Sequence, residues 1–531
     1  MQSLPLLLSC LLLATPALNQ DAPPRPNILF IFSDDHAPHA IGAYGSAYEG
    51  MDPTPRIDGL AAEGMLFRNS FCTNSICGPS RAVILTGLHS HRNGFRDNGD
   101  RFDGDQVTFP KLLKGAGYET ALLGKWHLGS TPQGFDYWEV LPGQGDYYNP
   151  KLISAEGERV VEGYCTDIVT DLALDWLKGR GDDDQPFLLM CQHKAPHRNW
   201  MPPLRHLDLW EGLEVPEPET LFDQHLDDAL VARLQEMEVD RDMNLVYDLF
   251  VEEHDGWDSE DGFANDSSGI RNLQRMSGDQ RRAWNEAFGP RNKAFLEAKL
   301  TGKELVRWKY QRYIKNYLRT VRGVDDSVGR LLDYLKESGL AENTIVVYSS
   351  DQGFFLGDHG WFDKRWMYEE SLRMPLIVRW PGVTEAGAVD EHMVQNLDYA
   401  QTFLEAAGVA APEGMQGRSL VPLLQGNEPD DWRSSIYYHY YAFPSIHRVA
   451  RHYGIRTERH KLIHYYQFGL WELFDLQTDP DERVNLFGQE GCDELTRGLQ
   501  KGLQGLRLEF GDEGGTELQS KEWQEKFGVR R

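Results

Sequence analysis

The chain has 531 residues, of which 40% are hydrophobic and 11% aromatic. At roughly 150 residues per domain this allows two to four domains, and such a chain can bury a core without a disulfide framework. The formal net charge is −28, which argues against nucleic acid as a partner. The same acidity keeps an exported protein soluble, and it requires that any anionic substrate be attracted by a local basic site.

The N-terminal residues are typical of a signal peptide. The apolar run Leu4–Leu13 is too short to span a bilayer, and small residues follow it. We therefore expect residues 1–18 to address the protein to the export machinery, and the mature protein to be periplasmic or secreted. Cys10 leaves open a lipoprotein processing site. No later stretch of the sequence predicts a transmembrane helix.

Short apolar runs alternate with amphipathic segments along most of the chain. Buried strands are predicted at 27–33, 118–123, 186–192, 344–350 and 375–379, and helices at 109–119, 166–178 and 303–338. This alternation favours an α/β fold, in which a mostly parallel central sheet is flanked by helices on both faces.

Two regions depart from this pattern. Residues 215–300 are highly charged and predict an insertion of loops and surface helices within a large domain over residues 25–430. Beyond a boundary near 425–433, short strands joined as hairpins are predicted at 435–441, 452–457, 461–466 and 470–476, followed by a helix at 493–510. Residues 431–531 are thus expected to form a small α+β domain with an antiparallel sheet.

Polar residues follow two of the predicted strands. Asp34 and Asp35 come directly after the first strand, and Asp351 and Gln352 come after the strand at 344–350. Ligands in parallel sheets bind beyond the carboxyl ends of the strands. Carboxylate and amide oxygens suit Ca²⁺, or alternatively Mg²⁺, although paired acids after strands also serve as helix caps.

The segment Cys77-Gly-Pro-Ser-Arg81, followed by Leu85-Thr-Gly, carries a second candidate. Pro79 fits the first turn of a helix, which places Cys77 at a helix N-terminus, where developing negative charge is favoured. Arg81 lies one turn further on, and a fixed cation beside a nucleophile suits an anionic electrophile. This pattern resembles the signature of the type I sulfatases of the alkaline phosphatase superfamily. The resemblance implies that a formylglycine-generating or sulfatase-maturating enzyme oxidises Cys77 to Cα-formylglycine.

Further motifs resemble the same family in the same order, from about residue 25 to about residue 490. The resemblance implies that the side chains of Asp34, Asp35, Asp351 and Gln352 hold one Ca²⁺ ion together with the modified Cys77. Gln352 stands where Asn is common in the family, and it argues against the two-zinc site of the related phosphatases, which needs an Asp-His pair.

The basic residues expected around the sulfate also come from the resemblance. Gly124-Lys125-Trp-His127 implies that Lys125 holds the formylglycine and the sulfate, and that His127 contacts the formylglycine hydroxyl. In His193-Lys-Ala-Pro-His197, the second histidine is implied as a sulfate ligand and general acid, and the first is left open between structure and function.

The last matching motif lies in the segment 357–364. Lys364 corresponds to the second sulfate-binding lysine of the family, which also assists departure of the alcohol. Asp358 and His359 resemble the contacts that carbohydrate sulfatases make to substrate hydroxyls, especially those acting on 6-sulfated N-acetylglucosamine.

We therefore expect a sulfatase that hydrolyses sulfate esters of carbohydrates, with 6-O-sulfated N-acetylglucosamine as one candidate. One alternative is a phosphonate monoester hydrolase or phosphodiesterase of the same superfamily, and another is a catalytically silent protein that binds sulfated glycans. Side chains that could line a sugar site, with core packing as the alternative for each, are those of Trp200, Trp361, His447, Arg451 and His452.

Overall fold

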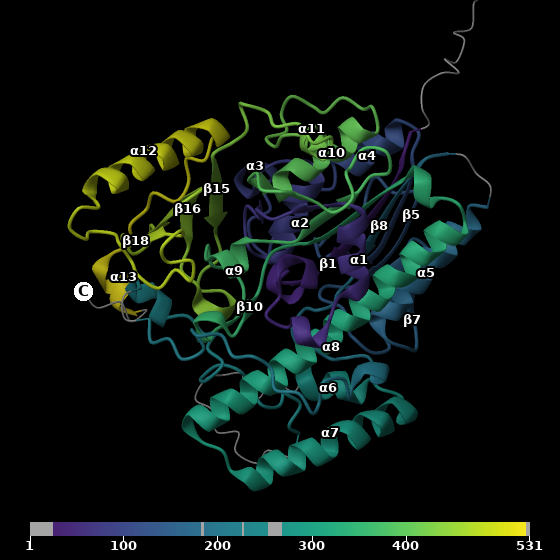
Figure 1. Ribbon diagram of the computed structural model, residues 1–531, viewed down its shortest axis with the longest axis horizontal. Coiled ribbons are helices and arrows are strands. Elements are labelled where there is room, and N and C mark those ends of the chain that lie inside the picture. Colours follow the sequence, from purple (N-terminus) through teal and green to yellow (C-terminus); the bar gives the residue numbers. More distant parts are fainter. Residues whose placement is uncertain (1–24, 182–184, 226–227, 253–267, 527–531) are drawn as a thin grey trace, which may run out of the picture.

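The computed structural model describes residues 25–181, 185–225, 228–252 and 268–526, so the predicted signal peptide lies outside the described residues. A ten-stranded sheet runs through the larger part of the molecule (Figure 1), in the order β13-β2-β12-β9-β1-β8-β4-β5-β6-β7. Its strands are β1 (Asn27–Ser33), β2 (Met65–Phe67), β4 (Glu119–Lys125), β5 (Tyr137–Leu141), β6 (Lys151–Ser154), β7 (Gly157–Val160), β8 (Phe187–Gln192), β9 (Thr344–Ser350), β12 (Leu376–Arg379) and β13 (Ala388–Asp390).

The centre of this sheet is parallel. Strands β9, β1, β8, β4 and β5 all run in one direction, whereas β12 lies antiparallel to β9, and β6 and β7 are antiparallel at the far side. Every residue of β1 and β9 is buried, as expected for strands covered on both faces. The predicted α/β class with a mostly parallel sheet is confirmed.

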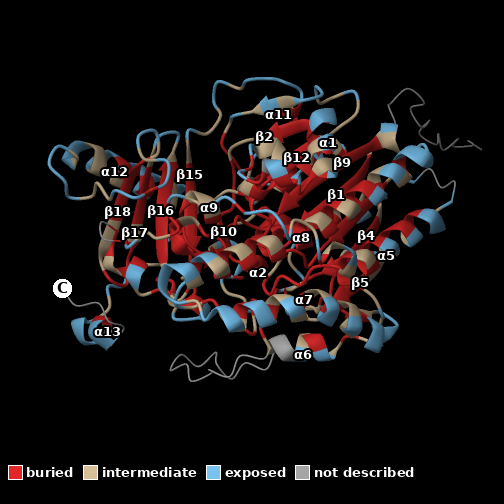
Figure 2. Cartoon of the chain, turned by 60° about the horizontal axis from the view of Figure 1, so that its bottom comes forward, coloured by how far each residue is buried: buried red, intermediate tan, exposed pale blue. Residues whose placement is uncertain are grey.

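Helices cover both faces of the sheet. Successive side chains of a strand point to opposite faces: Phe30 and Phe32 of β1 pack with α2, α4 and α10, whereas Leu29 and Ile31 pack with α1, α5 and α8. Figure 2 shows the strands buried between helices with exposed outer faces. The helices are α1 (Pro55–Glu63), α2 (Cys77–Thr86), α4 (Phe109–Gly115), α5 (Cys165–Gly179), α8 (Gly302–Glu337) and α10 (Tyr399–Ala406).

A second, antiparallel sheet lies beside the first (Figure 1). It consists of β15 (Ser435–Tyr440), β16 (His452–Thr457), β17 (His460–Tyr465) and β18 (Leu470–Asp475), and α12 (Asp493–Phe510) covers its outer face. Ile455 and Leu473 pack against Leu499 and Leu503 of α12, while Tyr438 on the other face joins the hydrophobic cluster of β1. The predicted strands and helix are confirmed, and the small sheet shares a core with the large one.

The segment predicted as a charged insertion contains α6 (Ser268–Gln274) and α7 (Gly278–Ala298), with irregular chain before them. Part of the predicted insertion, 226–227 and 253–267, lies outside the described residues. The irregular chain is not only surface, because Val239, Met243 and Leu249 are buried and pack with the N-terminal half of α8. This part is irregular, as predicted loops would be, but its buried residues form a layer of the core instead of lying on the surface.

The remaining elements are short. They are β3 (Ser70–Phe71), α3 (Ser90–Asn93), β10 (Phe355–Leu356), β11 (Phe362–Asp363), α9 (Glu369–Leu372), β14 (Val394–Gln395), α11 (Val421–Leu424) and α13 (Lys521–Lys526). The chain between α11 and β15, where a domain boundary is predicted, is irregular. Among the described residues, no helix has the length and apolar character needed to cross a membrane.

Candidate active site

The carboxyl ends of four neighbouring strands carry most of the predicted site residues. Asp34 and Asp35 follow β1, Asp351 follows β9, Lys125 ends β4, and His197 lies in the loop after β8. The strand order β9-β1-β8-β4 makes these ends neighbours. The parallel sheet thus joins segments that are far apart in sequence, and the backbone N–H of Asp35 donates to Asp351 Oδ1 at 3.0 Å.

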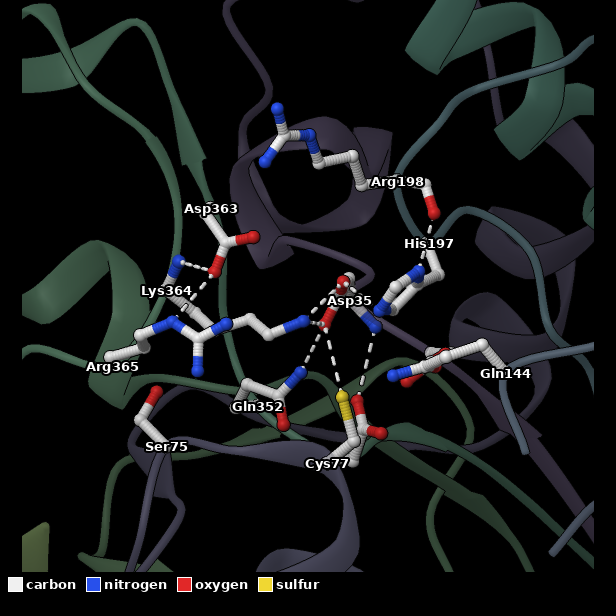
Figure 3. A network of polar contacts seen from close by, with 12 residues as sticks. Asp35, Ser75, Cys77, Gln144, His197, Arg198, Gln352, Asp363, Lys364 and Arg365 are labelled. Carbon is white, nitrogen blue, oxygen red and sulfur yellow. Dashed lines mark hydrogen bonds and ion pairs between the residues drawn. The ribbon is translucent and has the colours of Figure 1, made fainter. Parts of the chain in front are cut away.

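Helix α2 brings Cys77 to the same place (Figure 3). Cys77 is the first residue of α2, and its Sγ lies 4.0 Å from Asp35 Oδ1. A Cβ at Gly78 would lie 2.6 Å from the ring of Phe95, so only glycine permits this close packing. The hydroxyl of Ser80 donates to the carbonyl of Asp351. The Cys-Gly-Pro-Ser-Arg motif therefore also fixes the helix N-terminus against the strand ends.

The buried acids are paired with cations. Lys364, just after β11, places Nζ 2.6 Å from both carboxylate oxygens of Asp35. The ammonium of Lys125 donates to Asp34. Arg81 Nε lies 3.1 Å from Asp351 Oδ2. Three basic side chains beside three buried acids leave little net charge to attract a sulfate, so a bound metal ion would make the cluster positive.

Burial sets the protonation of this cluster. It raises the pKa of Asp35 to about 7, against the opposing effect of Lys364, and it lowers the pKa of Lys125 well below its usual value. Burial also raises the pKa of the Cys77 thiol to about 12. An unmodified thiol at this position would stay protonated near neutral pH, and it would be a poor nucleophile.

Two half-buried histidines lie at the edge of the cluster. His197 Nδ1 donates to the carbonyl of Arg198 at 2.5 Å, which leaves Nε2 facing Asp35 Oδ2 at 3.7 Å. Burial and the nearby Lys125 lower the pKa of His197 and of His127 well below the usual value. Both imidazoles are therefore neutral near pH 7, and His197 needs the negative charge of a bound substrate before it can act as a general acid.

The acids and the amide fit a calcium ion. Oxygens of Asp34, Asp35 and Asp351 lie within 4.8 Å of one another. Asp34 Oδ1 and Gln352 Oε1 are buried and receive no hydrogen bond from a described residue, while Gln352 Nε2 donates to Asp35. Hard oxygens from carboxylates and an amide are the ligands that Ca²⁺ prefers, and two of them accept no hydrogen bond from a described residue, although Arg81 Nη2 lies 3.5 Å from Asp34 Oδ1.

The sequence did not predict several polar residues of the site. Gln192 accepts a hydrogen bond from Arg81 at 3.0 Å, and Gln144 accepts one from Lys125 at 2.5 Å. Gln192 is a polar residue at the carboxyl end of a predicted strand, which is the feature that identified Asp34. Gln144 lies in a loop and belongs to no recognised motif.

Three basic residues near the site were also missed. Arg198 forms an ion pair with Asp248 at 2.6 Å, and Arg365 one with Asp363 at 3.3 Å. Burial lowers the pKa of Lys194 to about 8. Each of the three directly follows a residue singled out from the sequence: His193, His197 or Lys364. This adjacency is the sequence feature that could have predicted their place near the site.

The structure places Asp358 and His359 at the turn of the β10–β11 hairpin. Asp358 lies 3.3 Å from His39 Nε2, and His359 is 1% exposed with Glu370 3.7 Å from its Nε2. Glu370 raises the pKa of His359 to about 9, although burial opposes this shift. These contacts position the hairpin that carries Lys364, and a contact with a substrate hydroxyl stays a prediction.

The candidates for a sugar-binding surface are mostly core residues. Trp200, Trp361 and His452 are fully buried and pack among other rings, for example Trp361 on Trp366 at 5.3 Å. In this structure they are therefore not available for stacking on a sugar. His447 Nε2 lies 3.3 Å from Asp363 Oδ2, which puts it beside the site.

Two further residues singled out from the sequence are Arg451 and His193. Arg451 is half-buried. His193 shares a hydrogen bond with Ser327 at 2.9 Å and is fully buried, which favours the structural alternative.

Comparison with known proteins agrees with this geometry. A family model described as sulfatase matches residues 26–409, which is more than half of the chain. The chain belongs to the sulfatase family. It is a sulfuric ester hydrolase with the fold of the alkaline phosphatase superfamily. A model of the C-terminal region of N-sulphoglucosamine sulphohydrolase matches residues 357–509.

Several relatives of this sulfatase act on glucosamine sulfates. The N-acetylglucosamine-6-O-sulfatase of Bacteroides thetaiotaomicron is 46% identical over 496 residues, which cover 92% of this chain and 87% of the relative. The human N-acetylglucosamine-6-sulfatase is 26% identical over 78% of this chain and 67% of its own length.

Solved structures extend the comparison. One, described as a complex with its substrate D-glucosamine-2-N,6-O-disulfate, matches with a TM-score of 0.88 and 45% identity, over 93% of this chain and 99% of that one. A phosphonate monoester hydrolase from Silicibacter pomeroyi matches with a TM-score of 0.70 at 21% identity, over 92% of this chain and 96% of that one, and shows the shared fold alone.

Proposed function

We propose that this sulfatase hydrolyses the 6-O-sulfate ester of glucosamine residues, such as 6-O-sulfated N-acetylglucosamine, in sulfated carbohydrates. The observation that supports this substrate is the 46% identity to an N-acetylglucosamine-6-O-sulfatase over 92% of the chain. The proposal includes Cα-formylglycine at position 77, made from Cys77 by a maturating enzyme, and one Ca²⁺ ion. The signal-like N-terminus supports export as part of the same proposal.

Two groups supply chemistry that the unmodified side chains lack. Ca²⁺ held by Asp34, Asp35, Asp351 and Gln352 would add positive charge beside the sulfate, and a hydrated aldehyde at position 77 would offer a hydroxyl nucleophile. The thiol that it replaces has its pKa raised to about 12 by burial. The ligand atoms of Asp34, Cys77 and His197 lie within 4.8 Å of one another, a set that suits Zn²⁺. Oxidation of Cys77 would remove the sulfur ligand from this set.

The chain's own residues would then hold the ester and move its protons. Lys125 and Lys364 bring two ammonium groups to the acids beside position 77, where they can bind sulfate oxygens. His197 Nε2 faces the same acids and is placed to protonate the departing alcohol. His127 Nδ1 has no hydrogen-bond partner among the described residues, and the lowered pKa leaves it neutral and able to accept the second hydroxyl proton.

Removal of calcium should abolish turnover. EGTA treatment followed by desalting is expected to lower kcat on a sulfate ester by about 10²–10³-fold, because the charge beside the sulfate is lost. Added Ca²⁺ should restore the rate. The measurement is initial rate against free Ca²⁺ concentration. Full activity after chelation, or restoration by Zn²⁺ but not by Ca²⁺, would contradict the assigned metal.

A substrate panel should separate the proposed function from its rival. We expect kcat/KM on N-acetylglucosamine-6-O-sulfate to exceed that on the 3-O-sulfate by at least about 10²-fold, because the two isomers place the ester differently against fixed charges. The same margin is expected over the 6-phosphate and over a phosphonate monoester. The measurement is product release from each compound by the same preparation. Higher kcat/KM on the phosphorus esters would favour the phosphonate monoester hydrolase reading, and equal rates on all sulfates would remove the assigned position.

A further inference from the structure

A second cluster of metal-type ligands lies outside the active site. Atoms of Asp223, His225 and His359 lie within 4.8 Å of one another, and both histidines are almost fully buried, at 3% and 1% exposure. Two of these residues belong to the segment before α6, and the third lies at the turn of the β10–β11 hairpin. The active-site chemistry proposed above does not use Asp223 or His225.

Three of the four histidine ring nitrogens in this cluster lack a hydrogen bond to any described residue. His225 Nε2 and both ring nitrogens of His359 are buried without a hydrogen-bond partner among the described residues. A buried imidazole nitrogen without a partner costs free energy. Such atoms are expected to be satisfied by a ligand, and a cation is the ligand that accepts electron pairs from two imidazoles and a carboxylate together.

The surroundings of both imidazoles are those of metal ligands. His225 Nδ1 is hydrogen-bonded to Asp228 Oδ2 at 2.8 Å, so Nδ1 carries the proton and Nε2 presents its lone pair. On the other histidine, Glu370 Oε2 lies 3.7 Å from Nε2. A carboxylate on the far nitrogen is the arrangement that fixes the tautomer of a metal-bound histidine and raises its basicity.

The third ligand is placed by the same short segment. Asp223 Oδ1 accepts the backbone N–H of His225 at 3.1 Å, and Oδ2 forms an ion pair with Arg483 Nε at 3.7 Å. Asp223 is half-buried and lines a surface hollow with Phe222, Gln224 and Arg483. The hollow reaches the Asp223 ligand, and a cation bound there would compete with the ion pair between Asp223 and Arg483.

We propose that Asp223, His225 and His359 form a second metal site, which takes Zn²⁺ and fastens the segment before α6 to the hairpin that carries Lys364. Two imidazoles and one carboxylate suit Zn²⁺, whereas Ca²⁺ and Mg²⁺ prefer oxygen ligands alone. Lys364 follows His359 by five residues, with β11 between them. The metal would therefore stabilise the support of a sulfate-binding lysine, and His359, which is 1% exposed, would serve as a metal ligand instead of contacting a substrate hydroxyl.

The test measures zinc binding with the active site excluded. Full-length Cys77→Ala protein, saturated with Ca²⁺, is titrated with Zn²⁺ alone, and metal per chain and the shift in melting temperature are recorded. We expect one Zn²⁺ per chain and a rise in melting temperature. Asp223→Asn, which keeps the oxygen that holds the His225 backbone, and His225→Gln should each lose this Zn²⁺ and the shift.

Two further variants calibrate the result. Asp228→Asn should weaken Zn²⁺ binding, with a dissociation constant raised by about 10–100-fold, but it should not abolish the site. His392→Gln removes a partly exposed histidine that is also paired with an aspartate, Asp390 at 3.1 Å, and should bind Zn²⁺ as the parent does. If His225→Gln fails to fold, Asp223→Asn decides. No bound Zn²⁺ in the parent, or equal binding by the parent and Asp223→Asn, would overturn the proposal.

Discussion

Cys77→Ala is expected to lower kcat on a sulfate ester by on the order of 10⁵-fold, the scale of loss when a covalent nucleophile is removed. Cys77 lies at the N-terminus of a buried helix, 4.0 Å from Asp35 and within 4.8 Å of the Asp34 and His197 ligand atoms. The other polar groups of the site bind and orient, and they offer no replacement nucleophile. The measurement is kcat of purified variant and parent, with circular dichroism to confirm folding.

Cys72→Ala is the matched control for this variant. Cys72 is a second fully buried free thiol only five residues away, and its Sγ approaches the carbonyl of Ser371 at 3.8 Å. The control should keep its kcat within a few-fold of the parent. Mass spectrometry of the peptide that contains position 77 should show the aldehyde or its hydrate in the parent. Turnover by Cys77→Ala in a preparation free of other sulfatases would remove Cys77 from its assigned role.

Lys364→Ala should lower kcat by about 10²–10³-fold, the usual loss when one charged contact to a developing anion is removed. Its Nζ lies 2.6 Å from both oxygens of Asp35. Burial opposes the charged form of Lys364, but Asp35 holds its pKa above the usual value, so the ammonium is retained near neutral pH. The measurement is a comparison of kcat and KM at saturating Ca²⁺.

Lys309→Ala provides the control for Lys364→Ala. Lys309 is also buried, and its ammonium donates to the carbonyl of Asp240 at 2.6 Å, away from the strand ends. This variant measures the effect of losing a buried lysine that lies outside the site. It should lower the free energy of unfolding but leave kcat nearly unchanged. A Lys364→Ala enzyme with unchanged kcat and only a raised KM would show that Lys364 binds ground state and transition state equally.

The regular parts of the fold were predictable because their patterns are local. Strands such as β1 and β9 are continuous apolar runs, and α8 has helical periodicity over its length, so their limits matched within about one or two residues. The predicted helix at 109–119 ends at Gly115, because β4 begins at Glu119. The site acids were found for a related reason, since they directly follow strands of a parallel sheet.

Other features depend on packing between distant segments, which a single sequence does not display. The irregular chain at 239–249 has no period, yet Val239, Met243 and Leu249 form a core layer with α8. Trp200 and Trp361 look like exposed aromatics in a polar context, but rings from other elements enclose them. Gln144 has no motif, and only the fold places it on Lys125.

The complete burial of α2 sets an order of events during biosynthesis. All ten residues Cys77–Thr86 are buried, and the first of them lies against Asp35 at the end of β1. The proposed maturating enzyme would therefore have to engage this segment before the fold encloses it. A molecule that folds before oxidation would keep its Cys77 thiol. The active fraction of a preparation would then depend on the rate of folding relative to the rate of oxidation, and slower folding would give more active enzyme.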